Sequence, residues 1–215
     1  MAVAIAIFPV PIIASVLLVS SERGRAKASA FVLAWVVGLA AVGAIVLLVA
    51  GEANASEDGE PATWVNILLL ILGLLVLAAA VKQWRGRPRA GEEAPTPGWM
   101  RTIGAFTIAK AGGTGFALSA LNPKNILLTV AAAAEIAEVG LAAGKQIASL
   151  LVFVLIASVG VLAPLVFAFA FGDRSREPLD GMRDWLARYN AVIVTVLLLL
   201  IGVKLIGDAV SGFSS

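Results

Sequence analysis

The sequence predicts an all-α membrane protein with six transmembrane helices, arranged as two inverted three-helix repeats. Three observations lead to this fold. Of the 215 residues, 60% are hydrophobic and only 14% are charged, with a mean hydropathy of +0.97, which is far outside the range of soluble domains. The apolar residues form runs of membrane-spanning length. Basic residues are concentrated in every second connection between these runs.

Six apolar runs each supply about 20 residues, the length that a helix needs to cross a bilayer. They cover residues 2–19, 29–50, 64–81, 104–134, 147–171 and 191–210. The fourth run is too long for one straight span. Proline removes a backbone donor and clashes with the preceding turn, so we expect the fourth run to break at Asn122-Pro123. We expect a similar break at proline in the first run.

The charges of the connections predict the orientation of the helices. Basic residues follow the first, third and fifth runs, beginning with Arg23, Lys82 and Arg174 respectively. The connection at residues 51–63 contains no Lys or Arg, and the connection at 135–146 contains only Lys145. The positive-inside rule then places both termini of this multi-pass protein outside, with six spans between them. The amino terminus lacks a basic leader, so the first run is expected to be retained.

A linker rich in Pro and Arg, residues 86–103, divides the chain into two halves. Residues 1–85 form the predicted first three-helix repeat, and residues 104–215 the second. An odd number of helices in each half requires the second half to be inverted relative to the first. In residues 178–189, apolar side chains recur at helical spacing, which predicts a short amphipathic helix at the membrane interface.

Both halves carry a proline in their first helix. Pro9 and Pro11 interrupt the first run, and Pro123 interrupts the fourth. A single proline in a transmembrane helix is often only a kink. Interruptions at corresponding positions of two halves, however, point to the binding site of a transporter.

Lys124 directly follows the second of these breaks. If helices begin at Pro11 and Pro123 and run in opposite directions, their N-termini converge on one region, to which Lys124 adds a positive charge. Such a region favours an anion, for example a carboxylate, sulfate or phosphate group. Asn122 and Asn125 either donate hydrogen bonds to that anion or only cap and mend the broken helix.

Lys204 and Asp208 lie four residues apart in the last run, the spacing of an intrahelical ion pair. The pair either neutralises itself or couples transport to a proton or ion. No metal site or cofactor is predicted. No nucleophile–base constellation is visible, so an enzyme is not expected. The arginines lie in short connections between apolar runs and do not indicate nucleic-acid binding.

Several segments together resemble the GAP family of peptidoglycolipid-addressing or sulfolipid-addressing proteins, within the lysine-exporter (LysE) superfamily. They are residues 8–14, the basic turn 22–25, residues 31–38 with Trp35, residues 121–127 and residues 185–190. The resemblance spans nearly the whole chain. It implies two inverted repeats and a substrate site that includes Pro9, Pro11, Asn122, Pro123, Lys124 and Asn125. It does not extend to Lys204 or Asp208.

Three functions follow as alternatives. The resemblance implies an exporter that moves an envelope glycolipid or peptidoglycolipid, an anionic amphiphile, across the inner membrane. Elsewhere in the superfamily the substrates are small amino acids or cations, which gives the second alternative. The third is an accessory scaffold for a larger lipid pump. The expected partners are accordingly membrane lipids or the glycolipid substrate, a second copy of the chain in a homodimer, and larger lipid-export machinery.

Overall fold

The computed structural model describes residues 1–53, 63–86, 100 and 102–214. All regular secondary structure in these residues is helical, as the composition predicts. The chain forms two compact units, Met1–Ser56 with Thr96–Leu186, and Glu57–Pro95 with Ala187–Ser215. These units do not follow the predicted division at residues 86–103. The division into two repeats therefore stays a prediction.

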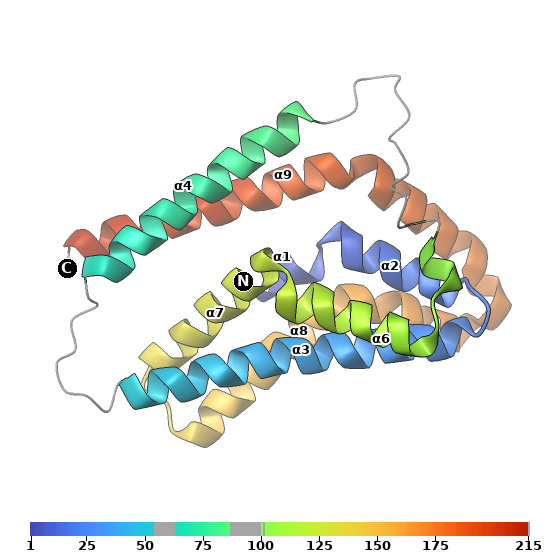
Figure 1. Ribbon diagram of the computed structural model, residues 1–215, viewed down its shortest axis with the longest axis horizontal. Helices are drawn as coiled ribbons and strands as arrows, with labels where there is room; N and C mark the ends of the chain where they lie inside the picture. Colours follow the sequence, from blue (N-terminus) through green and yellow to red (C-terminus); the bar gives the residue numbers. More distant parts are fainter. Residues whose placement is uncertain (54–62, 87–99, 101, 215) are drawn as a thin grey trace. The chain divides into compact units, whose positions relative to one another are not determined.

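Helices cover most of each apolar run of the sequence, and those of the second and sixth runs begin well before their runs. Figure 1 shows the helices in chain order. They are α1 (Ala2–Ala6), α2 (Pro9–Val19), α3 (Gly24–Ala53), α4 (Thr63–Arg85), η1 (Ile103–Ala105), α6 (Ile108–Phe116), η2 (Ala117–Leu121), α7 (Pro123–Glu138), α8 (Ala143–Phe171), η3 (Gly172–Ser175) and α9 (Arg176–Ser214). Among the described residues, α3, α8 and α9 are long and apolar enough to span a membrane. The bent pair of residues 108–121 and α7, with an angle of 57°, is a candidate broken span.

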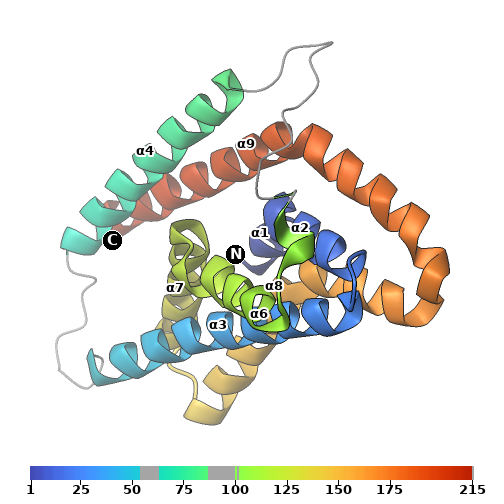
Figure 2. The same cartoon turned by 45° about the vertical axis from the view of Figure 1, so that its right-hand side comes forward.

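Helix α3 is the centre of the larger unit. It contacts α2, α6, η2, α7 and α8, and α8 in turn contacts α1 and α2. Figures 1 and 2 show α3 running alongside α6 and α8. Phe31 and Trp35 stack on the buried face of α3, with their ring centroids 6.4 Å apart. Lipid tails are as apolar as these side chains, so close packing stabilises the unit more than exclusion from the surroundings does.

The outer face of α8 is apolar as well. Leu151, Leu155, Val159 and Val166 are all more than half exposed. A soluble protein rarely presents such a continuous apolar stripe to water. The stripe therefore fits a helix that faces the hydrocarbon of a membrane.

In the smaller unit, α4 pairs with the part of α9 after Ala187. Figures 1 and 2 both show these two helices side by side. They approach at two glycines: a Cβ added to Gly73 would lie 3.1 Å from the carbonyl oxygen of Gly202, and one added to Gly202 would lie 3.2 Å from that of Gly73. Small residues at a crossing allow this close backbone contact.

The segment 178–189 was expected to be a short interfacial helix. In the structure these residues are part of α9, which is helical without interruption from Arg176 to Ser214. Leu179 and Leu186 are buried, whereas Trp185 is 55% exposed. The amphipathic pattern is thus present, but it belongs to the first half of a long helix.

Candidate functional site at the two helix breaks

The first break separates α1 from α2. Phe8 has an extended backbone, with φ −69° and ψ 120°, and α2 begins with Pro9. The sequence placed the start of this helix at Pro11, which is wrong by one turn or less. Both prolines lie in the first turn of α2, where the backbone N–H groups have no intrahelical acceptor and a proline costs no hydrogen bond.

The second break has the same local geometry and falls where the sequence predicts it. Helix α6 continues into the π-helical turn η2, Asn122 is extended with φ −75° and ψ 118°, and α7 begins with Pro123. The Asn122 Oδ1 accepts a hydrogen bond of 3.1 Å from the Lys124 backbone N–H. Asn122 is therefore the N-cap of α7.

Asn125, which follows the break, provides a hydrogen-bond donor for the helical turn that precedes it. Its side chain is fully buried, and its Nδ2 donates a hydrogen bond of 2.7 Å to the Leu118 carbonyl in η2. The break leaves such carbonyls without their usual partners. The amide nitrogen of Asn125 thus has a structural role, while its Oδ1 is buried without a hydrogen-bond partner.

The two breaks meet in space. The Lys124 Nζ lies over the ring of Phe8, 3.6 Å from its centroid. Lys124 is the second residue of α7, and Phe8 is the N-cap of α2. The N-termini of these two helices are therefore neighbours, as the paired prolines predict. Phe8 was not among the residues predicted for the site, although it precedes Pro9 as Asn122 precedes Pro123.

The ammonium group of Lys124 has an unusual environment. Its Nζ is buried and has no hydrogen-bond partner, and among the described side chains no carboxylate pairs with it. A cation–π contact contributes about 0.5–2 kcal/mol. A lysine in the middle of a transmembrane helix costs about 2.5–3.5 kcal/mol. The Phe8 ring alone therefore does not offset the burial of this charge.

Two glycines bring the neighbouring long helices onto the breaks. A side chain on Gly38 of α3 would collide with the Ser119 Oγ in η2, beside the second break. A side chain on Gly160 of α8 would collide with the Ala6 carbonyl oxygen at the end of α1, beside the first break. Each half thus supplies a glycine that contacts the broken helix of the other half. These glycine contacts between the two halves were not predicted from the sequence.

Further buried polar atoms lack a hydrogen-bond partner in the larger unit. They are Trp35 Nε1 on α3, Thr129 Oγ1 on α7 and Ser158 Oγ on α8, in addition to Asn125 Oδ1. Thr129 lies one turn after Asn125. A buried polar group without a partner costs about 1–3 kcal/mol. Ser15, by contrast, is satisfied, because its Oγ donates a hydrogen bond of 2.8 Å to the Val161 carbonyl of α8.

The structure also places the other predicted site residues. Pro9 and Pro11 are buried, Asn122 is half-buried, and Pro123 is exposed. Lys204 and Asp208 form an ion pair of 2.8 Å on α9, with each side chain 44% exposed. This pair belongs to the smaller unit. Among the described residues, no group of three or more acidic side chains is arranged to hold a metal ion.

The long apolar helices and the broken span define a helical membrane protein with a lysine buried between two helix N-termini. The family profile described as Sap, sulfolipid-1-addressing protein (SfLAP), matches residues 1–211. The chain therefore belongs to this sulfolipid-addressing family, in agreement with the resemblance seen in the sequence. No curated protein and no solved structure matches the chain.

Proposed function

We propose that the protein exports an anionic envelope glycolipid across the inner membrane, and that Lys124 binds the acidic group of its head. The observation that carries this proposal is the buried Lys124 ammonium without a hydrogen-bond acceptor. Membership of the sulfolipid-addressing family supports a lipid with a sulfate group. Pro9, Pro11, Asn122, Pro123 and Asn125 shape the site, chiefly by setting where the two helices begin.

The charge at the site favours an anion over a cation. Lys124 carries a full positive charge, and the N-termini of α2 and α7 add partial positive charges where they meet. The prolines in these first turns have no N–H, and Asn122 already accepts the N–H of Lys124. The remaining first-turn donors for a sulfate, phosphate or carboxylate oxygen are the N–H groups of Val10 and Asn125. A cation would be repelled by this site. Export of a small cation is therefore the least favoured of the transport alternatives, whereas an amino-acid carboxylate shares the chemistry of a lipid sulfate.

A transport assay with matched variants tests the proposal. Purified protein is reconstituted in proteoliposomes, and the transfer of a fluorescent sulfated glycolipid between the leaflets is measured. We expect the wild type to accelerate transfer and Lys124→Met to lose at least about nine-tenths of this activity, because one charge-assisted contact is worth a factor of ten or more. Lys110→Met is the control, since Lys110 is exposed on α6 of the same bent span.

The substrate controls separate the alternatives. The same glycolipid without its sulfate should cross no faster with the protein than without it. Uptake of amino acids in place of the lipid would support the small-solute alternative. If the isolated protein moves neither class of substrate but copurifies with a larger lipid pump, it is an accessory subunit. Equal lipid transfer by wild type and Lys124→Met would contradict a role for this lysine.

We also propose the inner membrane as the location, with both termini outside. The support is the distribution of charge in the connections. In the structure, the basic α2–α3 turn lies next to the α8–α9 junction, since the Arg25 Nη2 donates a hydrogen bond of 3.3 Å to the Ala168 carbonyl. Lys27 donates one of 2.9 Å to the Gly104 carbonyl, just after the basic linker. The contact between the first and third basic connections supports their location on one membrane face.

A further inference from the structure

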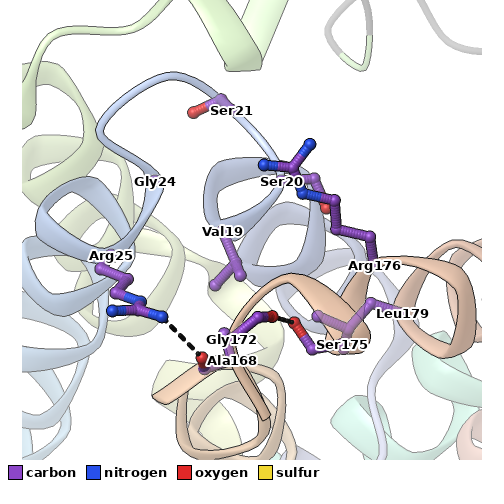
Figure 3. A pocket seen from close by; sticks show the side chains of 10 residues that line it. All are labelled: Val19, Ser20, Ser21, Gly24, Arg25, Ala168, Gly172, Ser175, Arg176 and Leu179. Carbon is purple, nitrogen blue, oxygen red and sulfur yellow. Dashed lines mark hydrogen bonds between the residues drawn. The ribbon is translucent and has the colours of Figure 1, made fainter.

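A second polar site lies in the larger unit, away from the helix breaks. It is a cavity of about 190 Å³ between the α2–α3 turn and the junction of α8 with α9 (Figure 3). Its lining includes two arginines and three serines, Arg25, Arg176, Ser20, Ser21 and Ser175. None of the lining residues is acidic. A water molecule occupies about 30 Å³ in the liquid, so the cavity has room for a group of several heavy atoms.

Arg25 is held in place at one side of this cavity. Its Nη2 donates to the Ala168 carbonyl, and its guanidinium lies 5.4 Å from the centroid of the Phe169 ring. Gly172, with φ +56°, lies beside this guanidinium: an added Cβ would be in ordinary van der Waals contact with the Arg25 Nη2, at 3.6 Å. Among the described side chains, no carboxylate pairs with Arg25. A guanidinium has five donors in a planar fork, so donors remain for a ligand.

Arg176 lines the other side of the cavity, and Figure 3 shows its guanidinium beside Ser20 and away from Arg25. The two arginines come from different elements, the start of α3 and the start of α9. An arginine thus lines the cavity from each of two elements. Proteins favour arginine for binding phosphate and similar oxyanions.

The backbone at the cavity adds to the positive field. Helix α3 begins at Gly24 and α9 at Arg176, so two helix N-termini face this region. Helices α2 and α8 end here and bring carbonyl groups with the opposite polarity. Two of these carbonyls are already covered, that of Ala168 by Arg25 and that of Gly172 by the Ser175 Oγ, at 2.6 Å. The arginine charges therefore determine the sign of the site.

We infer that this cavity binds the sulfate or phosphate ester of a lipid head group at the basic face of the protein, as the first contact before the lipid reaches Lys124. The inference has two steps. Binding at the cavity is argued from the cavity alone, whereas the later transfer of the lipid to Lys124 rests on the proposed function. Basic pockets between helices on the cytoplasmic side of membrane proteins bind acidic lipid head groups in this way.

Binding measurements on the full-length protein in nanodiscs test this inference. The probes are a sulfated galactolipid, phosphatidylglycerol, the unsulfated galactolipid and inorganic sulfate. We expect the sulfated lipid to bind and its affinity to fall at least about tenfold in Arg25→Gln and in Arg176→Gln. Arg183→Gln is the matched control: Arg183 is an arginine of the same helix α9 that pairs with Asp180 and Asp184 and does not line the cavity.

The outcomes are distinct. Binding of the sulfated lipid that is unchanged in both cavity variants, or reduced equally by Arg183→Gln, overturns the inference. Because Arg25 also holds the end of α8, Arg25→Lys serves as a second variant that keeps the charge and should retain most of the binding. If inorganic sulfate binds as tightly as the sulfated lipid, the cavity is a site for a free anion and not for a lipid head group. This outcome would contradict the inference.

The transport assay separates this inference from the proposed function. Lys124→Met should lose transport and keep head-group binding at the cavity. If the wild type binds the sulfated lipid through Arg25 and Arg176 but does not transport it, the proposed function fails and the cavity remains a lipid site. If the wild type transports the lipid and both cavity variants bind and transport it normally, only the inference fails.

Discussion

The Lys124 ammonium lies over the Phe8 ring, 3.6 Å from its centroid, and so joins the break in one half of the chain to the break in the other. Phe8 ends the break before α2, and Lys124 lies in the first turn of α7. The contact brings the two proline motifs together. Among the described residues, the Phe8 ring is the only partner of the buried ammonium group.

The cost of burying Lys124 leads to the first prediction. Lys124→Met removes a charge that has no hydrogen-bond partner and keeps an unbranched side chain over Phe8. We therefore expect the unliganded variant to be as stable as the wild type or more stable, by about 1 kcal/mol. Thermal unfolding in detergent measures this. A sulfated lipid should raise the unfolding temperature of the wild type more than that of the variant, because the variant can bind the lipid only at the cavity beside Arg25 and Arg176.

The opposite result would identify Lys124 as structural. If Lys124→Met unfolds at a clearly lower temperature, whereas Lys110→Met does not, the ammonium stabilises the fold itself. Phe8→Leu gives an independent check, since it keeps an apolar contact but removes the π face. It should weaken the fold by no more than about 1–2 kcal/mol.

The two asparagines are predicted to differ in their effect on stability. Asn125→Ala leaves the buried Leu118 carbonyl without its donor, at a cost of about 1–3 kcal/mol. Asn122→Ala removes an N-cap, which typically costs about 1 kcal/mol. Asn122→Asp retains the acceptor and should restore most of that loss. Unfolding by denaturant compares the three variants, and an Asn125→Ala variant as stable as the wild type would contradict the mending role.

The glycine contacts predict a graded series. Gly160→Ala places a Cβ on the backbone oxygen of Ala6, which does not move without shifting α1, and overpacking of this kind costs about 1–3 kcal/mol. Gly38→Ala meets the Ser119 Oγ, a side-chain atom that can rotate away, so its cost should be smaller. Gly113→Ala is the control: it meets nothing within 4 Å and should gain about 1 kcal/mol of helix propensity. Equal unfolding temperatures for all three would contradict the packing described here.

Much of this arrangement was predictable from local chemistry. Apolar runs and proline are strong signals, because a bilayer allows few alternatives to a helix and proline lacks the donor that a helix interior needs. The break at Asn122-Pro123 was predicted at the right residue for that reason. The start of α2 was placed at Pro11 instead of Pro9 because either proline fits the first turn of a helix, and sequence alone does not rank them.

The tertiary contacts were less predictable. Nothing in the order of residues says that Lys124 lies over Phe8, or that Gly160 meets Ala6, since each contact depends on how distant helices pack. The cavity between Arg25 and Arg176 was missed for the same reason. The sequence treated these arginines as markers of the inside face, and only the α2–α3 turn lying against the α8–α9 junction brings their side chains to one cavity.

The natural absence of cysteine makes the topology testable with single cysteines. Glu22 and Lys145 are both exposed, in the α2–α3 turn and in the first turn of α8 respectively. We expect Lys145→Cys to react with a membrane-impermeant maleimide on intact cells, and Glu22→Cys to react only after the membrane is opened. The wild type is the unlabelled control. Labelling of Glu22→Cys on intact cells would reverse the proposed orientation.

The Lys204–Asp208 pair on α9 yields the last prediction. The Nζ–Oδ2 distance is 2.8 Å, with the spacing of adjacent helical turns, and such a pair contributes only about 0.3–0.5 kcal/mol in water. In an apolar helix, replacing only one partner has a larger effect on stability. The charge that is left at membrane depth costs about 2.5–3.5 kcal/mol. We therefore expect Lys204→Leu or Asp208→Leu alone to lower the yield of folded protein, and the double variant to restore it. We expect the double variant to transport the lipid like the wild type, because the pair neutralises itself. A double variant that folds fully but transports nothing would instead assign the pair to proton or ion coupling, and the transport rate measured across a pH gradient would distinguish the two.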